Sequence, residues 1–427
     1  MPFGPDTSTT PRWAVVSTYP PTACGLASFT RSLVAGMAGH GADVEVVRVV
    51  DEPQPVVLAG VSHHLVTTCP ASATTTAAVL NGYDVVVVQH EYGIYGGADG
   101  DQVLAVLAEV TVPVITVLHT VLAEPSAHQR QVLQGVVSAS DVLVTMTRTA
   151  QQRVVDFYGA DPQCVHVIPH GAADALVTGI RPRPVQPVPA AAQRRPVVLT
   201  WGLLGDGKGI EWGIEALSAL RDLDPAPRYV IAGQTHPRVL EREGERYRRG
   251  LEAKALALGV SDHIVFDDRY LDAEALHRLV RAADVVLLPY DSLEQVTSGV
   301  LIEAVAAGRP VVSSRFPHAV ELLSDGAGLL VPQRDPAAIA AALRRVLTEP
   351  GLAGQMSRRA ETIAPELSWR AVAGRYLTEG AALCDVGPVR SGSEQLDSLL
   401  GSVVGTGLGG AVGSGVGAAG PALAVVA

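Results

Sequence analysis

The sequence contains little lysine, no paired cysteines and no run of 18 apolar residues before its C-terminal tail. Only Lys208 and Lys254 are lysines among the 427 residues, so arginine carries nearly all of the positive charge. The four cysteines are scattered without a Cys-x-x-Cys pair, which argues against a zinc site and a disulfide framework. Residues 1–13 lack the charged-then-apolar pattern of a signal peptide. These absences favour a cytoplasmic protein.

The charge balance is acidic, above all in the first half. The net charge is −11, and residues 1–175 contain 6 Lys and Arg against 15 Asp and Glu, a net of −9. Such a chain is a poor match for nucleic acid and for an anionic membrane surface. We therefore expect neither nucleic-acid binding nor stable membrane insertion.

Strand-like runs rich in valine and isoleucine alternate with helix-period segments along most of the chain. The runs are apolar on both faces, as in "DVVVVQH" (84–90) and "DVVLLPY" (284–290), and seven lie before residue 173 and six after residue 195. Buried strands that alternate with helices predict a parallel sheet covered on both faces. We therefore expect an α/β fold with two doubly wound, Rossmann-like domains that face each other across a cleft.

Composition sets the expected boundaries of these domains. The segment 177–196 is rich in proline and lacks a helical period, which is typical of a linker. Small, uncharged residues near the C-terminus bury too little area to offset chain entropy. The expected parts are, in order, a first domain (1–173), a linker (174–195), a second domain (196–366), a helix that packs back on the first domain (367–385) and a disordered tail (386–427).

A glycine-rich loop opens the second domain. In "TWGLLGDGKGIEWGIEAL" (200–217) a strand ends, glycines follow and a helix begins. This order places backbone N–H groups and Lys208 where a phosphate can bind. It is not the P-loop pattern, because no Ser or Thr follows the lysine. Taken alone, a plain turn with a surface lysine is the more common explanation.

A second turn of this kind follows the strand that ends at Tyr290. Thr297, Ser298 and Gly299 precede a helix, and Glu303 lies about one turn inside it. A helix N-terminus favours an anion, and a carboxylate can accept hydrogen bonds from the two hydroxyls of a ribose. The turn and the acid together indicate a phosphate and a ribose; a helix with one solvated acid is the alternative.

These motifs, in this order, resemble the family 4 (group 1) retaining glycosyltransferases, which have the GT-B fold. "EAVAAGRPVV" from Glu303 is similar to the second half of the family signature, and "GLLGDGKG" (202–209) to its Gly-Arg-x-x-x-x-Lys-Gly loop. "STYPPTACGLASFTRSL" (17–33) and "VIPHG" (167–171) resemble the glycine loop of the first domain and the segment before the linker. The resemblance extends over roughly residues 12–385.

The resemblance implies roles for particular residues. Glu303 would bind the donor ribose, Gly25 would let the first-domain loop approach the donor, and His119 would contact the transferred sugar. The diphosphate would be held by Lys208 and the amides around Ser298 and Gly299. The implied substrate-binding residues are Gly25, Gly202, Lys208, Thr297, Ser298, Gly299 and Glu303, and the implied catalytic residues are His119, Lys208 and Gln295.

Two positions depart from the family pattern and indicate a divergent subgroup. Gln295 stands where the family has the first glutamate of its pair, so it brings no charge to an oxocarbenium-like transition state. Leu203 stands where the family has an arginine, so one diphosphate cation is missing. Arg269, Arg315 and Arg148 are candidates to replace that cation, and the sequence does not choose among them.

The sequence indicates less about the acceptor site and about the need for a cofactor. His90 and Glu91 lie beyond a strand end in the first domain, beside a glycine-rich segment that indicates an acceptor loop. Asp267 and Asp268 form an acidic pair, but the resembled family usually neutralises diphosphate with Lys, Arg and helix dipoles. We therefore expect no metal and no other cofactor.

The resulting hypothesis is a retaining hexosyltransferase. It would move a hexose, with mannose or glucose favoured, from a nucleoside-diphosphate sugar to a hydroxyl of a glycan, glycolipid or small-molecule acceptor. Two alternatives stay open. One is a sugar-nucleotide epimerase on the same fold. The other is a catalytically weakened regulatory subunit that binds nucleotide sugar, which Gln295 and Leu203 favour.

Overall fold

The computed structural model describes residues 10–178, 194–269 and 271–388. Residues 179–193 of the expected linker and nearly all of the expected tail lie outside them. The chain forms two compact units: unit 1 contains the chain up to Pro169 and again from Trp369, and unit 2 is His170–Ser368. No helix among the described residues is both long enough and apolar enough to span a membrane.

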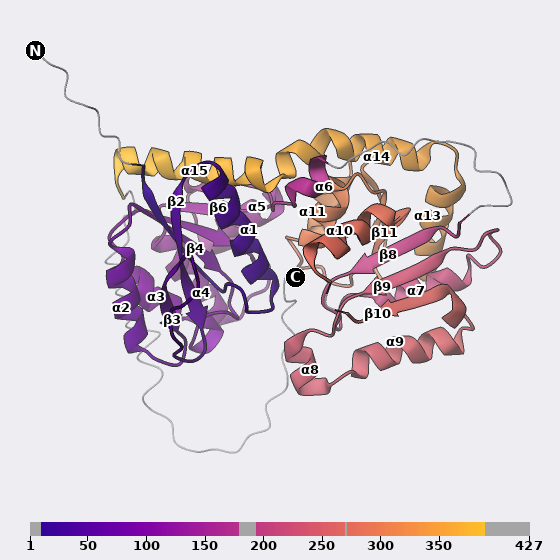
Figure 1. Cartoon of the computed structure of the whole chain (residues 1–427), viewed down its shortest axis with the longest axis horizontal. Coiled ribbons are helices and arrows are strands. Elements are labelled where there is room, and N and C mark those ends of the chain that lie inside the picture. Colours follow the sequence, from indigo (N-terminus) through magenta and orange to yellow (C-terminus); the bar gives the residue numbers. More distant parts are fainter. Residues whose placement is uncertain (1–9, 179–193, 270, 389–427) are drawn as a thin grey trace, which may run out of the picture. The chain divides into compact units, whose positions relative to one another are not determined.

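Unit 1 is a seven-stranded parallel sheet with the strand order β3-β2-β1-β4-β5-β6-β7 (Figure 1). Its main elements are β1 (Arg12–Ser17), α1 (Gly25–Gly39), β2 (Asp43–Val50), β3 (Val61–Val66), α2 (Ala71–Leu80), β4 (Val85–His90), α3 (Gln102–Glu109), β5 (Val114–Leu118), α4 (Ala127–Ser138), β6 (Val142–Thr145), α5 (Arg148–Tyr158), β7 (Val165–Val167) and α15 (Trp369–Val386).

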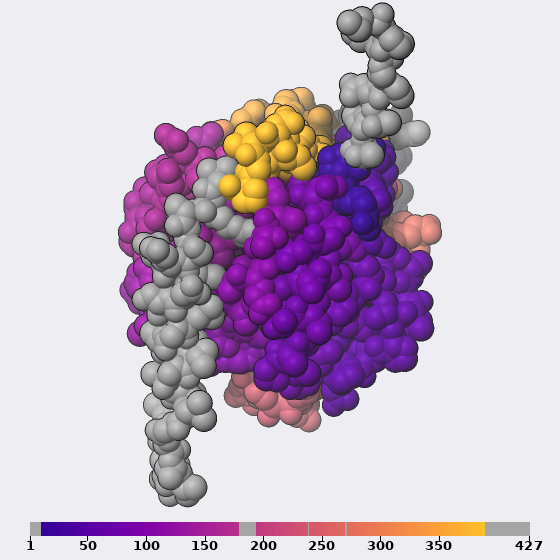
Figure 2. All heavy atoms as spheres, turned by 90° about the vertical axis from the view of Figure 1, so that its left-hand side faces the viewer, coloured from indigo at the N-terminus to yellow at the C-terminus, as the bar shows by residue number. Residues whose placement is uncertain are grey.

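The last helix, α15, completes the core of unit 1. Its buried face packs with α1 and with one face of the sheet in a single apolar cluster. Two glycines allow this close approach: a Cβ on Gly380 would lie 1.9 Å from the ring of Trp13, and one on Gly36 would lie 2.8 Å from the carbonyl of Trp369. Figure 2 shows α15, in yellow, seated against the indigo and purple atoms of unit 1.

Unit 2 is a six-stranded parallel sheet with the order β10-β9-β8-β11-β12-β13. Its main elements are α6 (Asp174–Thr178), β8 (Val197–Trp201), α7 (Ile210–Ser218), β9 (Arg228–Ala232), α8 (Pro237–Glu243), α9 (Arg246–Ala257), β10 (Ile264–Asp267), α10 (Ala273–Ala282), β11 (Val285–Leu288), α11 (Gly299–Ala306), β12 (Val311–Ser314), α12 (Pro317–Leu323), β13 (Gly328–Val331), α13 (Pro336–Thr348) and α14 (Leu352–Ile363). The first residues of the expected linker are therefore helical, because Leu176 of α6 packs into the core of this unit.

Alternation along the central strands explains why they are apolar on both faces. Val285 and Leu287 of β11 face a cluster with α7, α9 and α13, whereas Val286 and Leu288 face a cluster with α10, α11 and α12. Successive side chains of a strand point to opposite faces, so a sheet with helices on both faces requires apolar residues at every position. All thirteen predicted strands are present, and the predicted α/β class with two doubly wound sheets is confirmed.

In both sheets the strand order reverses at a single point. In unit 2, β8 pairs with β9 on one side and with β11 on the other. In unit 1, β1 pairs likewise with β2 and β4. Ligands of open α/β sheets bind beyond the carboxyl ends of the strands at such a reversal. The loops after β8 and β11, and those after β1 and β4, are therefore the places to look for function.

Candidate functional site

Close backbone contacts fix the loop after β8 (202–209) at the reversal point of unit 2. Gly209 has a φ of +62°, and a Cβ there would lie 1.9 Å from the carbonyl oxygen of Pro289. Gly233 approaches Gly202 just as closely, at 1.8 Å between a hypothetical Cβ and the Gly202 oxygen. The amide of Asp291 donates to the Gly207 carbonyl at 2.9 Å. Glycine is thus required where this loop meets β9 and the segment after β11.

Lys208 lies in this loop and is only partly exposed. Its Nζ sits over the Tyr290 ring, 4.7 Å from the centroid, a cation–π contact that holds the ammonium without neutralising it. Burial lowers the pKa of Lys208 to about 8. An ammonium group short of a counter-charge and of water is well suited to a bound anion.

The start of α11 supplies further donors at the same edge of the sheet. Ser298 caps the helix, since its Oγ accepts from the Leu301 N–H at 3.3 Å. The N–H groups of Gly299 and Val300 have no hydrogen-bond partner among the described residues. The hydroxyl of Thr297 is fully buried and also without a partner. An eight-residue helix with two free amides and an unpaired hydroxyl at its N-terminus is a candidate anion site.

The Ser298 amide, in contrast, is already occupied. It donates to Nδ1 of His318 at 2.9 Å, and His318 is only 3% exposed. Of the amides around Ser298 and Gly299 that are expected to hold the diphosphate, the Ser298 amide is thus engaged within the protein. Nothing in the sequence pattern marked His318, because it lies twenty residues further along the chain on another helix.

Glu303 lies in α11 and is partly exposed. Trp201, the last residue of β8, directs its Nε1–H at Glu303 Oε2 over 3.4 Å. Burial raises the pKa of Glu303 to about 7, although the Trp201 N–H counteracts part of that shift. Near neutral pH this carboxyl is thus partly protonated, and hydrogen-bond donors such as vicinal hydroxyls would favour its ionised form.

Gln295 and Leu203, the two residues that depart from the family pattern, both lie in unit 2. The Gln295 amide is nearly buried and donates to the Thr297 carbonyl at 3.1 Å, so it shapes the loop before α11. Leu203 is partly exposed in the loop after β8. Of the arginines considered as replacements, Arg269 is bound to Asp267 at 2.7 Å. Arg315 directly follows β12, is exposed and has no polar partner among the described residues.

In unit 1 the reversal point carries a second helix N-terminus. Gly25 begins α1, and Cys24 before it caps the helix, with its Sγ accepting from the Ala27 N–H at 3.4 Å. The N–H groups of Gly25 and Leu26 have no partner among the described residues. Cys24 was not singled out from the sequence, since thiols are weak acceptors and uncommon as helix caps.

His119 and His90 are both deeply buried in unit 1. His119 Nε2 lies 2.6 Å from Gln89 Oε1, and its ring meets the edge of Phe29 at a centroid distance of 4.8 Å. His90 Nδ1 and Gln89 Nε2 have no hydrogen-bond partner. Burial lowers the pKa of His90 to about 4, so this ring is neutral. Two unpaired polar atoms thus lie at the end of β4, where an acceptor loop was expected.

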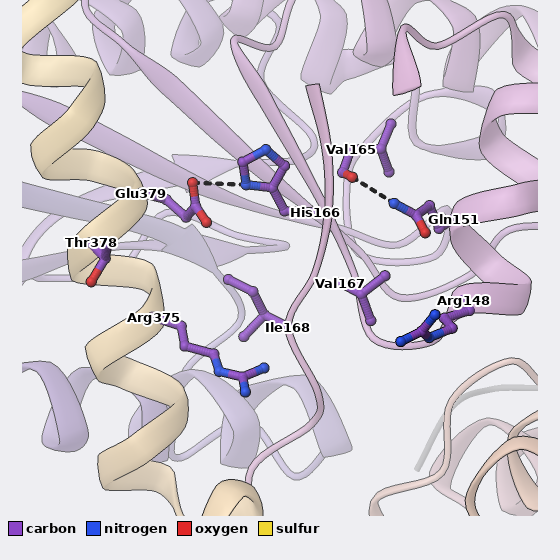
Figure 3. Close-up of a pocket in the computed structure, with 9 residues that line it drawn as sticks. All are labelled: Arg148, Gln151, Val165, His166, Val167, Ile168, Arg375, Thr378 and Glu379. Carbon is purple, nitrogen blue, oxygen red and sulfur yellow. Dashed lines mark hydrogen bonds and ion pairs between the residues drawn. The ribbon is translucent and has the colours of Figure 1, made fainter. Parts of the chain in front are cut away.

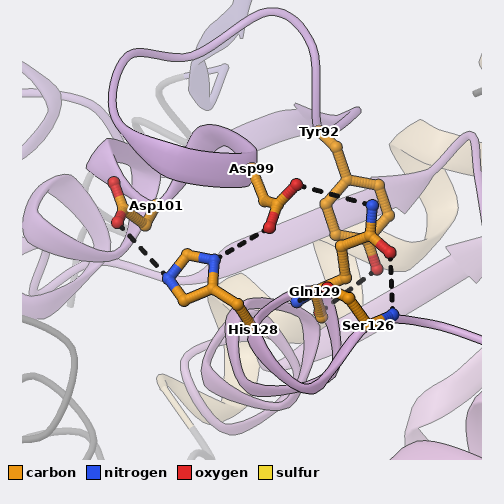
Figure 4. A network of polar contacts seen from close by, with 6 residues as sticks. All are labelled: Tyr92, Asp99, Asp101, Ser126, His128 and Gln129. Atoms are coloured by element: carbon orange, nitrogen blue, oxygen red, sulfur yellow. Dashed lines mark hydrogen bonds and ion pairs between the residues drawn. The ribbon is translucent and has the colours of Figure 1, made fainter. Parts of the chain in front are cut away.

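The loop after β4 is tied to α4 by a polar network (Figure 4). His128 lies between two carboxylates, with Nδ1 2.9 Å from Asp99 and Nε2 3.6 Å from Asp101. Gln129 also donates to Asp99, at 3.4 Å. Nearby, Thr120 donates to Glu91. The expected acceptor region is therefore ordered and rich in carboxylates.

A pocket of about 570 Å³ lies elsewhere in unit 1, lined by β7, the start of α5 and α15 (Figure 3). His166 pairs there with Glu379 at 2.8 Å, and Gln151 donates to the Val165 carbonyl. Arg148 is the single residue named from the sequence that lines it. The pocket lies at the edge strand β7, three strands from β4 and therefore away from the reversal between β1 and β4. No group of three or more potential metal ligands occurs within the described ranges.

Comparisons with known proteins agree with this geometry. A family model described as "Glycosyl transferases group 1" matches residues 195–349, which lie in unit 2. The chain is 31% identical over 283 residues to the D-inositol 3-phosphate glycosyltransferase of Acidothermus cellulolyticus, which is 60% of this chain and 59% of that protein. It is 31% identical over 303 residues to the protein of the same name in Corynebacterium efficiens, which is 65% of this chain and 68% of that protein. The chain belongs to the group 1 glycosyl transferases.

This membership fits the fold, although the chain spans under two thirds of the length of the Acidothermus relative. Among solved structures, the HepE protein of Anabaena in complex with UDP and glucose matches with a TM-score of 0.66. The two share 16% identity over 87% of this chain and all of that one. At such identity the likeness supports the GT-B fold, which the group 1 membership and the two parallel sheets also indicate.

The contact between Gly209 and Pro289 gives a test of the loop geometry. Gly209→Ala and Gly207→Ala both place a side chain at positive φ, a strain of roughly 1–2 kcal/mol each. Only the Gly209 change also drives a Cβ into a backbone carbonyl; the space beside Gly207 is open. We expect Gly209→Ala to lower the melting temperature by several degrees more than Gly207→Ala in scanning calorimetry. Equal melting temperatures would show that the loop moves away from Pro289 without strain.

Proposed function

We propose that this group 1 glycosyl transferase is a retaining hexosyltransferase that uses a nucleoside-diphosphate sugar, with glucose or mannose as the transferred sugar. The observation that carries the proposal is the set of unsatisfied groups at the reversal point of unit 2. Two free amides, a buried hydroxyl without a partner and a partly dehydrated ammonium group lie at one edge of one sheet, with Glu303 one turn away.

These groups match the parts of a nucleotide sugar. The Gly299 and Val300 amides, the Thr297 hydroxyl and Lys208 are donors for a diphosphate. Glu303 is an acceptor for the two ribose hydroxyls, as acids are in other doubly wound nucleotide sites. Arg315, exposed after the neighbouring strand, is the proposed replacement for the family arginine, whose position Leu203 occupies here. We propose that these cations and amides neutralise the diphosphate without a divalent metal.

The proposed chemistry is mainly electrostatic. As the bond between sugar and phosphate breaks, negative charge grows on the leaving phosphate, and fixed N–H donors and Lys208 stabilise it. The oxygen of an acceptor hydroxyl, held on the same face of the sugar, bonds to the anomeric carbon while its proton passes to the leaving phosphate, so the configuration is retained. We propose that Gln295 and His119 orient the sugar, although both side chains are engaged in hydrogen bonds in this structure.

The engagement of Gln295 favours one second candidate, a subunit that binds nucleotide sugar but transfers it slowly. Its amide is bound to the Thr297 carbonyl and brings no charge to the reaction centre. The purified protein distinguishes the two functions: a transferase releases nucleoside diphosphate from a bound donor in the presence of acceptor. Tight binding without such release would favour the regulatory role.

The charges of unit 1 favour an acceptor that carries hydroxyls but no phosphate. The loops that follow β1 to β5 contain no Lys or Arg and six carboxylates: Asp51, Glu52, Glu91, Asp99, Asp101 and Glu124. The guanidinium groups of Arg48 and Arg153, from β2 and α5, contact these loops and donate to the Tyr19 and Val121 carbonyls. Carboxylates bind vicinal hydroxyls well and repel a phosphate. Relatives named for an inositol phosphate acceptor are only 31% identical to this chain. We therefore propose that its acceptor is an unphosphorylated polyol or glycan.

Substitutions in unit 2 test the donor site. Glu303→Gln should weaken binding of nucleoside, nucleoside diphosphate and nucleotide sugar alike, because charge-assisted hydrogen bonds of about 1.5–3 kcal/mol each are lost. Lys208→Ala should weaken only the two diphosphate ligands. Calorimetry with uridine, UDP and UDP-glucose, repeated for the guanosine and adenosine series, measures both effects. A folded Glu303→Gln protein that binds all three ligands like the wild type would remove α11 from the donor site.

Affinity for the donor should depend on pH with a maximum between about 7 and 8. Below pH 7 the empty site has Glu303 protonated, so ribose binding must release a proton and the affinity rises with pH. Above pH 8 Lys208 loses its charge, so diphosphate binding must take up a proton and the affinity falls. Calorimetry of a nucleotide sugar in buffers of different ionisation enthalpy reports both protons. Glu303→Gln should abolish the acid limb and Lys208→Ala the alkaline limb; a flat profile would contradict both assignments.

Acceptor pairs that differ by one phosphate test the acceptor class. We expect kcat/KM to be at least about tenfold higher for myo-inositol than for D-inositol 3-phosphate, and for glucose than for glucose 6-phosphate, a difference of about 1.4 kcal/mol. The Asp99→Asn, Asp101→Asn double variant should narrow this preference, because it removes two repelling charges. Glu109→Gln with Asp156→Asn, which lie outside these loops, is the matched control. Preference of the wild type for the phosphorylated member would rule out the assignment.

A further inference from the structure

One short segment after β12, namely Phe316, Pro317 and His318, contacts the groups of unit 2 that we propose to bind the anion. Phe316 stacks on Tyr290 with ring centroids 5.2 Å apart, and Lys208 lies over that same tyrosine ring. Phe316 and Tyr290 are almost completely buried. The segment therefore supports the lysine from one side through two stacked rings.

The same segment holds the loop before α11 at two points. His318 Nδ1 accepts the Ser298 N–H at 2.9 Å, and the His318 backbone amide reaches the Gln295 carbonyl at 3.5 Å. The Gln295 side chain in turn donates to the Thr297 carbonyl. The four residues 295–298 are thus pinned in place immediately before the free amides of Gly299 and Val300.

The chemistry of the contact requires a neutral ring with its proton on Nε2. An Nδ1 atom that accepts a hydrogen bond cannot carry a hydrogen. A protonated ring would place its own Nδ1–H against the Ser298 N–H, and the two donors would repel each other. The surroundings agree, since burial, with a smaller contribution from neighbouring His170, lowers the pKa of His318 to about 3. His170 is itself neutral, because burial lowers its pKa to about 4. Without this acceptor the buried Ser298 N–H would have no partner, and the loop would have to turn it elsewhere.

We propose that His318 is a positioning residue for donor binding: its Nδ1 holds the Ser298 amide and thereby aims the Gly299 and Val300 amides and the Thr297 hydroxyl at the donor diphosphate. The inference rests on the proposed donor site and adds a residue that does not touch the ligand. The Ser298 amide has a structural use here, so only the next two amides remain for the anion.

Three substitutions separate this role from simple packing. His318→Asn keeps an acceptor two bonds from Cβ, at the place of Nδ1, whereas His318→Gln moves the acceptor one bond further away and His318→Leu removes it. We expect the Leu variant to bind UDP, or the diphosphate of the base that the wild type prefers, at least about tenfold more weakly, since a buried N–H is left unpaired. The Gln variant should be weakened similarly, and the Asn variant should bind within a few fold of the wild type. Binding of the bare nucleoside should be unchanged in all three, because Glu303 is untouched.

The controls make each outcome decisive. His277→Leu, a second histidine of unit 2 on α10 with no polar contact to the loop, should bind every ligand like the wild type. If His318→Leu does not fold, the Asn and Gln variants decide: Asn close to wild type with Gln weakened supports the role. Equal binding by Asn and Gln, whether strong or weak, overturns it. Equal losses for nucleoside and diphosphate also overturn it, because they indicate general damage.

The wild type is measured first, against UDP-, GDP- and ADP-sugars, so that two kinds of failure stay distinct. If it binds none of them, the proposed function fails and the role of His318 fails with it. If it binds a donor that the folded His318 variants bind equally well, only the role of His318 is overturned and the donor site stands.

Discussion

The pairing of β8 with β11 is the constraint on which the site in unit 2 depends. Chain order reverses there, so the loops after these two strands leave the sheet side by side. The reversal also brings the two loops into close contact. A Cβ on Gly209 would lie 1.9 Å from the Pro289 carbonyl oxygen, so only glycine fits there. Lys208, in one loop, consequently lies over Tyr290, which begins the other. The cation and the helix N-terminus are neighbours because two strands are neighbours.

The sequence predicted the elements of this arrangement well, for a physical reason. Strands buried on both faces are largely apolar, so central strands such as β4, β5, β8 and β11 stand out as runs of valine, isoleucine and leucine, whereas β2 and β3 near one edge also carry charged or polar residues. Loops at the carboxyl edge have to bend sharply, so glycine marks them. The same reasoning predicts Lys208 in the loop after β8 and Glu303 about one turn into the helix that follows β11, and both residues lie there.

What the sequence did not reveal are contacts between residues that are distant along the chain. A single histidine in "SSRFPHAVEL" has no periodicity that connects it to Ser298, yet their hydrogen bond changes which amides remain free. Likewise, Gln295 could be recognised as a departure from the family pattern, but not as a donor to the Thr297 carbonyl. The sequence does not distinguish Arg269 from Arg315 as a replacement for the missing diphosphate cation, whereas the structure does, because Asp267 binds Arg269. Partner choice among polar side chains depends on packing in three dimensions, which local patterns do not encode.

The two units share one topology but surround it with different side chains. Both sheets reverse order once and both place a helix N-terminus at the reversal, so the backbone offers an anion site in each. The side chains of the surrounding loops, however, differ between the two units. In unit 2 the loops at the carboxyl edge carry six carboxylates and four cationic residues, Lys208, Arg269, Arg315 and Arg334, whereas the first five loops of unit 1 carry six carboxylates and no Lys or Arg. Two of the unit 2 arginines are paired, Arg269 with Asp267 and Arg334 with Asp291. The backbone therefore determines where a ligand can bind, and the side chains of the neighbouring loops determine the charge that a ligand meets there.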